Sequence, residues 1–99
     1  RVDGRDVILD LPVSPWEAAL GAVVGTPTPD GQVQLSVPAG SAAGRKLRLK
    51  GKGLPGDPPG DMYAVLTIAL PPSASPKAQE AYRAMAQSFD FNPRAAFGT

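Results

Sequence analysis

The sequence predicts a mainly β domain, a small antiparallel β-sandwich of about five strands with one short internal helix and a C-terminal amphipathic helix. Two observations lead to this class. Several short stretches alternate apolar and polar residues with a period of two, which is the pattern of a strand with one buried face. Twelve prolines and eleven glycines separate these stretches and favour turns over long helices. At 99 residues, the chain is long enough for one modest hydrophobic core.

The first half of the chain contains three predicted strands. Residues 6–13 place valine and leucine at alternate positions and end near a proline, as a strand does. Residues 22–28 form a second candidate, weakened by its glycine and prolines. Residues 32–37 alternate strictly, and the preceding Pro-Asp-Gly at 29–31 supplies the conformations of a tight hairpin turn. We therefore expect a hairpin over residues 22–37.

A short helix is predicted between the first two strands. Ser14 is suited to cap it, Pro15 occupies its first position and Gly21 ends it. Trp16 and Leu20 are four residues apart and share one face of such a helix. We expect that face to plug one end of the sheet.

The second half of the chain predicts two strands and the C-terminal helix. Residues 46–50 alternate charge with leucine and are bracketed by glycines. Residues 61–70 are apolar on both faces, which is typical of a central or doubly covered strand. Ser75 and Pro76 open a helix, and Asn92-Pro93 prevents its continuation into the tail, residues 90–99. Its apolar stripe comprises Ala78, Ala81, Tyr82, Met85, Ala86 and Phe89.

The composition argues against an enzyme. Cysteine and histidine are absent, which removes thiol chemistry, the usual general base and the commonest metal ligands. Residues 51–56 match G-x-G-x-x-G, but the prolines that follow leave no helix to hold a pyrophosphate, so we interpret the glycines as turn residues. No membrane span is expected, since the apolar runs are too short. We therefore expect no catalytic residues, no cofactor and no metal.

Two features remain as candidate binding surfaces. Five cations lie within residues 45–52, and they could either track phosphates or form a solvated strand face that discourages aggregation. They are Arg45, Lys46, Arg48, Lys50 and Lys52. The helix stripe could either cover its own sheet or pair with a second copy of the chain. The sequence leaves both alternatives open.

The features combine into a pattern that resembles one family. In order, they are DLPVSPWEAALGAVV, a P-D-G hairpin, VQLSVPAGSAAGRKLRLKGKGLPG, GDMYAVLTIALP and S-P-K-A-Q-E-A-Y. This pattern resembles the second C-terminal β-domain of zinc-free J-domain co-chaperones, the DnaJ family, and within it the bacterial curved-DNA-binding type. The resemblance covers residues 7–94. It implies a β-sandwich domain over residues 1–72, followed by a dimerisation helix and tail over residues 73–99, both part of a longer protein.

The resemblance also implies a function. Members hold unfolded client polypeptides for the seventy-kilodalton heat-shock chaperone and form homodimers, so the helix stripe becomes the expected dimer interface. Carrying over the family's client groove points to Leu9, Leu11, Val24 and Thr26. The histidine-proline-aspartate signature that stimulates the partner ATPase is absent from this chain. DNA binding by the cations at 45–52 is the alternative function. The expected location is the bacterial cytoplasm, with the nucleoid as the site of the DNA-binding alternative.

Overall fold

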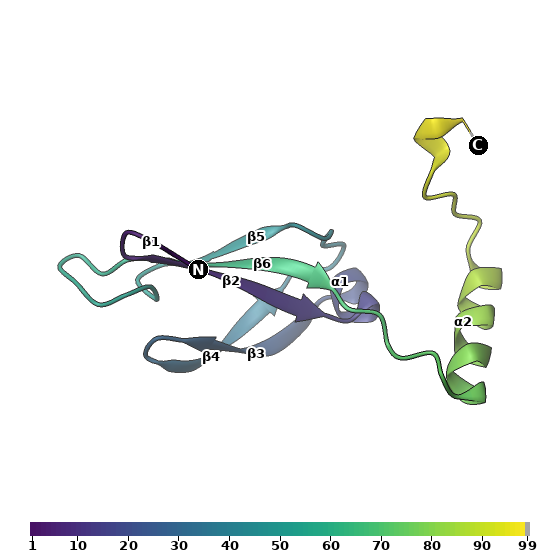
Figure 1. Cartoon of the computed structure of the whole chain (residues 1–99), viewed down its shortest axis with the longest axis horizontal. Helices are drawn as coiled ribbons and strands as arrows, with labels where there is room; N and C mark the ends of the chain where they lie inside the picture. The colour runs from purple at the N-terminus through teal and green to yellow at the C-terminus, as the bar shows by residue number, and fades with distance from the viewer. Residues whose placement is uncertain (99) are drawn as a thin grey trace.

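The computed structural model describes residues 1–98, which form a strand-built body and a helical arm (Figure 1). The mainly β class is confirmed. In chain order the elements are β1 (Val2–Asp3), β2 (Asp6–Val13), α1 (Pro15–Leu20), β3 (Ala22–Thr28), β4 (Gly31–Val37), β5 (Lys46–Leu49), β6 (Met62–Ile68), α2 (Pro76–Ser88) and a 3₁₀ turn (Ala95–Phe97). The two-residue strand β1 was not expected. It pairs with the start of β2 through a turn at Gly4 and Arg5.

The strands form two sheets. One has the order β1-β2-β6-β5, and the other is the hairpin of β3 and β4. The prediction that all pairs are antiparallel is wrong, because β2 and β6 run parallel, with Leu11 opposite Leu66. Parallel pairing requires a long connection, and here α1, the hairpin and β5 provide it. As predicted, the apolar strand β6 is central, between β2 and β5.

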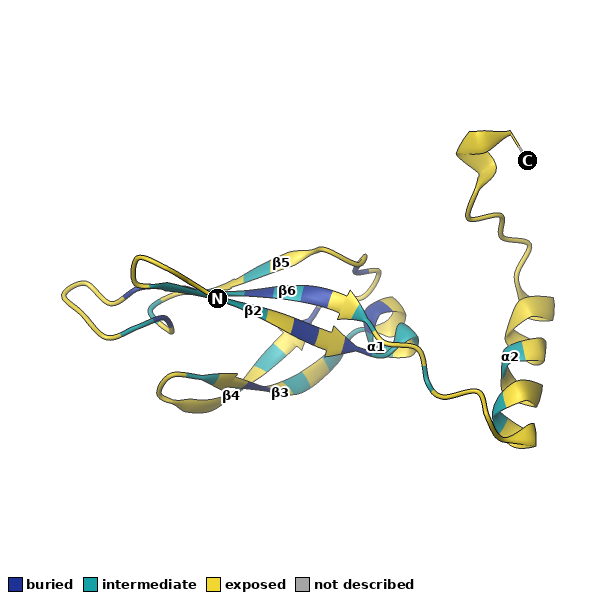
Figure 2. Ribbon diagram, in the orientation of Figure 1, coloured by how far each residue is buried: buried dark blue, intermediate teal, exposed yellow. Residues whose placement is uncertain are grey.

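The hydrophobic core joins the two sheets and α1 (Figure 2). The buried residues at its centre come from β2, α1, β4 and β6. They are Leu11, Val13, Ala18, Val37, Ala64 and Leu66. Partly buried residues of β3, β4, β5 and β6 pack around them, namely Val24, Leu35, Leu47, Leu49 and Ile68. The alternation predicted for β5 is confirmed, because its leucines face this core and its cations face solvent.

Helix α1 begins as the sequence predicts but presents a different face to the core. The Ser14 hydroxyl accepts from the Glu17 N–H at 3.2 Å, and the Glu17 carboxylate accepts from the Ser14 N–H at 2.9 Å. Trp16 and Leu20, expected to plug the sheet, are instead 56% and 78% exposed, whereas Ala18 is buried. A small side chain lets this short helix approach the core closely, and six residues are too few for periodicity to decide the face.

The β3–β4 hairpin is confirmed, with residues 29 and 30 between the strands. Of the turn residues, only Gly31 has a positive φ, at 122°, so the aspartate does not adopt the left-handed conformation that we expected. The Thr28 hydroxyl donates to the Gly31 carbonyl at 2.6 Å. This bond links the last residue of β3 to the first residue of β4 across the turn.

The loop over residues 50–61 folds back onto Arg5 at the end of the body opposite α2 (Figure 1). The Leu54 N–H donates to the Arg5 carbonyl at 2.8 Å, and the Arg5 guanidinium donates to the Pro58 carbonyl at 2.8 Å. Gly60 packs so closely that a Cβ there would lie 1.9 Å from the Arg5 carbonyl oxygen. As predicted, no helix follows the glycines of this loop. The close packing against Arg5 explains why residue 60 is a glycine.

Helix α2 stands apart from the body (Figure 1). Ser75 caps it by accepting from the Ala78 N–H at 3.1 Å, with Pro76 at the first position, as predicted. None of its residues is buried, and it packs on neither sheet. The radius of gyration is 17.1 Å, against about 13 Å for a compact chain of 100 residues. The arm accounts for this elongation.

Candidate functional surfaces: a helical arm and a basic strand

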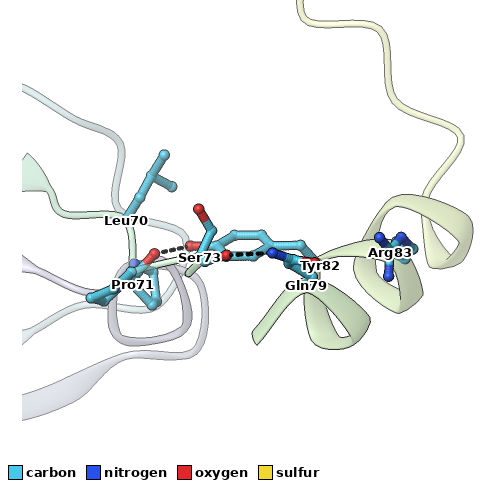
Figure 3. Close-up of a pocket in the computed structure, with 7 residues that line it drawn as sticks. Leu70, Pro71, Ser73, Gln79, Tyr82 and Arg83 are labelled. Carbon is cyan, nitrogen blue, oxygen red and sulfur yellow. Dashed lines mark hydrogen bonds between the residues drawn. The ribbon is translucent and has the colours of Figure 1, made fainter. Parts of the chain in front are cut away.

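Two hydrogen bonds tie α2 to the linker that follows β6. The Tyr82 hydroxyl donates to the Pro71 carbonyl, and the Gln79 side-chain amide donates to the Ser73 carbonyl at 3.1 Å (Figure 3). The rings of Pro71 and Pro72 restrict the linker's backbone further. The angle between arm and body is therefore set by local contacts along the joint and not by packing of α2 on a sheet.

The apolar stripe of α2 is largely accessible. Met85 and Phe89 are 42% and 64% exposed, Ala81 is exposed, and Ala78 and Tyr82 are half-buried. In the described residues, 1–98, the stripe does not cover its own sheet. The hydrogen bond of Tyr82 to the linker gives that residue a role within one chain, which the sequence did not indicate. Pairing of the stripe with a second copy stays a prediction.

Two hollows follow the stripe. One, of about 320 Å³, lies between the start of α1 and the N-terminal half of α2, and Trp16 forms part of its wall. The other, of about 700 Å³, lies along the C-terminal half of α2 up to Phe91. Tyr82 and Met85 line both hollows, and we call the residues that line the two hollows on α2 the apolar strip. Sequence reasoning noted the i, i+4 spacing of Trp16 with Leu20 but expected that face to plug the sheet, and it missed the place of Trp16 beside α2.

The basic strand carries less free charge than its sequence indicates. The Arg48 guanidinium contacts the Asp61 carboxylate at 2.6 Å, and the Lys46 ammonium lies 5.4 Å from the centre of the Tyr63 ring. Within residues 1–98, the other three cations, Arg45, Lys50 and Lys52, are exposed and make no ion pair. Three of the five predicted phosphate contacts are therefore engaged by neither an ion pair nor an aromatic ring.

Asp61 fixes the base of the loop that follows the basic strand. Its carboxylate accepts from the Gly51 N–H at 2.8 Å and from the Arg48 side chain at 2.8 Å. The Gly51 bond first, and then the Arg48 bond, hold the pKa of the Asp61 carboxyl below its ordinary value, while the same contact raises the pKa of Arg48. The Asp61 N–H in turn donates to the Asp6 carboxylate at 2.8 Å. Arg48 thus contributes to the loop's structure.

The four residues predicted to bind clients lie on β2 and β3, in different sheets. Leu11 and Thr26 are only 6% and 0% exposed, whereas Leu9 and Val24 are half-buried. Leu11 belongs to the core, and Val24 packs against it. The groove stays a prediction, and the burial of Leu11 and Thr26 weighs against it.

Within residues 1–98, no group of three or more acidic side chains is placed to hold a metal ion. In the same residues, no helix has both the length and the apolar character needed to cross a membrane.

Comparison with known proteins decides the family. The profile described as the DnaJ C terminal domain matches residues 1–71. The chain belongs to this DnaJ family. The resemblance inferred from the sequence is therefore confirmed, and the family match supports a co-chaperone-like, non-enzymatic role.

The chain is similar to several bacterial proteins named Curved DNA-binding protein. That of Coxiella burnetii is 53% identical over 93 residues, covering 94% of this chain and 30% of the relative. Those of Pseudomonas putida and Escherichia fergusonii are 41% identical over 95 residues and 44% over 99 residues, covering 94% and 98% of this chain and 30% and 32% of the relatives. The chain thus spans about a third of their length.

The similarity to these DnaJ relatives includes the arm. A match that covers 94% of the chain leaves too few residues outside it to exclude α2. The arm, like the body, therefore has a counterpart in these relatives.

Proposed function

We propose that this chain is the dimerising, client-holding module of a bacterial cytoplasmic co-chaperone that presents unfolded polypeptide to the seventy-kilodalton heat-shock chaperone. The observation that carries the proposal is the arm. Helix α2 exposes Met85 and packs on neither sheet, and Phe89, the residue directly after the helix, is exposed as well, in a chain of the DnaJ family. An apolar helix face of this kind is stabilised by burial against a partner.

Strand edges support the client-holding part of the proposal. Within residues 1–98, β3 and β4 pair only with each other, and β5 pairs only with β6. Their outer backbone groups are free to pair with an extended segment of a client, as in β-strand addition. Exposed apolar side chains such as Leu20 and Val23 lie beside β3 or on it. Two bodies joined by their arms would hold one client at two places and gain avidity.

We expect Met85→Asp to convert a dimer into a folded monomer. A carboxylate buried in an apolar interface is costly, so the dissociation constant should rise about 100-fold or more. The fold should persist, because α2 contributes no buried residue to the body. Sedimentation velocity over a concentration series measures the mass, and light scattering of a heat-denatured client measures aggregation suppression. Both dimerisation and suppression per mole should fall together.

The matched control is Gln87→Asp, which adds the same charge to an exposed position about 200° around α2 from Met85. It should leave the mass and the suppression unchanged. A wild-type chain that is monomeric at all concentrations would overturn dimerisation through the arm. A dimer that suppresses no aggregation would overturn client holding alone.

DNA binding is the second candidate. It is favoured by the free cations Arg45, Lys50 and Lys52 at one edge of the sheet and by the names of the relatives. Each phosphate contact contributes a slope of about −0.9 to the dependence of log K on log salt concentration. Three contacts in one chain therefore predict a slope of about −2.7, which corresponds to weak, strongly salt-sensitive binding.

We expect Lys50→Gln combined with Lys52→Gln to reduce the size of this slope by about 1.8. Fluorescence anisotropy with a labelled duplex, from about 50 to 200 mM salt, measures the slope. The control pair, Lys77→Gln with Arg83→Gln, removes two exposed cations from α2 and should leave the slope unchanged. An equal reduction of the slope in both double variants would indicate a non-specific charge effect. An unchanged slope in both would exclude the basic strand as the DNA site.

A further inference from the structure

The sheet of β1, β2, β6 and β5 has two edges that differ in their capacity to accept another strand. At one edge, β1 covers only the start of β2, and the part of β2 beyond it contains Pro12, which has no N–H to donate. At the other edge, within residues 1–98, β5 pairs only with β6 and contains neither proline nor glycine. Figure 1 shows β5 along the margin of the body. The edge at β5 is therefore the more open of the two.

The backbone groups of β5 that point to the open edge belong to its two cations. The Arg45 carbonyl, directly before β5, accepts from the Leu66 N–H of β6 at 2.9 Å, and β5 continues from there in antiparallel register. Successive residues of such a strand turn their backbone N–H and C=O groups alternately towards the partner and away from it. Leu47 therefore turns its backbone groups to β6, whereas Lys46 and Arg48 present theirs to the open edge.

The side chains of β5 divide between the two faces of the sheet. Leu47 and Leu49 are half-buried and pack against the core, so part of their surface is still accessible. Lys46 and Arg48 are exposed on the solvent face, and Lys50, directly after β5, is exposed as well. A strand added beside β5 would set every second side chain opposite a cation and the side chains between them opposite a leucine. The edge thus favours an alternating sequence.

The charge at this edge favours carboxylates and opposes a second copy of β5. Five cations lie within residues 45–52, and in the described part of the chain only Arg48 among them forms an ion pair, with Asp61. Two copies of β5 side by side would set cation against cation, which is destabilising in a sheet. A strand with aspartate or glutamate at these positions is instead stabilised by the same charges.

A nucleic acid would use only part of this edge. Its phosphates would contact the cations, but phosphates offer no donor to the backbone carbonyls of Lys46 and Arg48 and no apolar group to the leucines. An extended polypeptide offers a backbone, carboxylates and apolar side chains together. The combined features of the edge therefore fit a polypeptide better than a duplex.

We propose that the open edge of β5 binds extended client segments in which acidic and apolar residues alternate, and adds them to the sheet as a further strand. The inference rests on the client-holding role proposed above and names the client sequences that this edge selects. Backbone pairing with Lys46 and Arg48 supplies affinity for any extended segment, whereas the cations and the leucines supply the selectivity.

Three labelled peptides of equal length test the selectivity by fluorescence anisotropy, each kept dilute while the chain is titrated. The first alternates glutamate with valine, the second has the same composition in two separate blocks, and the third alternates lysine with valine. We expect the alternating glutamate peptide to bind at least about tenfold more tightly than the blocked one, and the lysine peptide not to bind. A blocked peptide that binds as tightly as the alternating one would overturn the proposal.

The variant Lys46→Glu with Lys50→Glu reverses the charge beside β5. It should weaken binding of the glutamate peptide at least about tenfold and bind the lysine peptide instead. The control, Lys77→Glu with Arg83→Glu, makes the same charge change at exposed positions of α2 and should leave the binding of both peptides unchanged. Equal losses in the two double variants would mean that net charge alone attracts the peptide, and would overturn selection by the edge.

Methylation of every second backbone amide of the peptide tests strand addition on the unmodified chain. An added strand turns alternate N–H groups towards β5, so one of the two methylated sets should abolish binding and the other should leave it within about threefold. Binding that survives both sets would show that no backbone pairing occurs, and would overturn the proposal.

The remaining outcomes separate this inference from the proposed function. A chain that suppresses aggregation of a heat-denatured client but does not prefer the alternating peptide would overturn this inference alone. A chain that does neither would overturn both. A labelled duplex that binds more tightly than the alternating peptide and displaces it would assign the edge to nucleic acid and overturn the proposal.

Discussion

Gly60→Ala should lower the free energy of unfolding by about 3 kcal/mol, one of the largest effects expected of a single methyl group in this chain. The added Cβ would lie 1.9 Å from the Arg5 carbonyl oxygen and 2.3 Å from its carbon. Both are backbone atoms, and the same carbonyl accepts from the Leu54 N–H. Relieving the clash therefore displaces the β1–β2 turn and breaks this bond. Urea unfolding followed by far-ultraviolet circular dichroism measures the loss.

Gly56→Ala is the matched control, because the three atoms nearest to its Cβ all belong to the Arg5 side chain, the first at 2.6 Å. The guanidinium can swing away at the cost of its exposed hydrogen bond to Pro58, so the loss should be about 1 kcal/mol. If Gly60→Ala were as stable as the parent chain, the loop would not be seated on Arg5.

Leu66→Ala should cost about 3 kcal/mol or more, within the range of about 2–5 kcal/mol for such truncations. Leu66 is 1% exposed on the central strand β6, where it pairs with Leu11 of β2 and lies in the core cluster with Val37 of β4. Its truncation leaves a cavity that β2 and β5, the strands on either side of β6, cannot close. Because the total free energy of unfolding of a domain is about 5–15 kcal/mol, the midpoint of the unfolding transition should fall by a large fraction.

Leu70→Ala is the control for this variant. Leu70 follows β6 directly but is 72% exposed, so its truncation should change the free energy of unfolding by less than about 0.5 kcal/mol. Similar losses in the two variants would mean that the core does not lie between the sheets, where Leu66 faces it.

The features predicted correctly depend on neighbouring residues. Ser14 and Ser75 cap their helices because a hydroxyl next to free backbone N–H groups acts locally, and Pro15 and Pro76 fit the first helical positions for the same reason. The parallel pairing of β2 with β6 depends on how the chain travels between two distant strands. An alternating pattern identifies the buried face of a strand and contains no information on its direction.

In the candidate surfaces, too, the features set by neighbouring residues were predicted and those set by distant contacts were not. The accessible stripe of α2 follows from helical spacing, but whether it covers its own sheet depends on the linker, whose hydrogen bonds with α2 are not evident from either segment alone. The pairing of Arg48 with Asp61 joins strand β5 to the residue just before β6 and depends on the register of the two strands. Sequence reasoning therefore overestimated the free charge of the basic strand and assigned Trp16 to the end of the sheet, whereas Trp16 is exposed and lines a hollow beside α2.

The joint at residues 69–82 has a mechanical consequence. In the proposed two-fold dimer, any change of angle at this joint appears twice in the distance between the two bodies, once for each arm. Two hydrogen bonds and two adjacent prolines set the stiffness of the joint, and none of them belongs to the core. The opening between the bodies, and with it the size of the client that fits, is thus a property that substitutions in the joint can adjust while the core and the apolar strip stay unchanged.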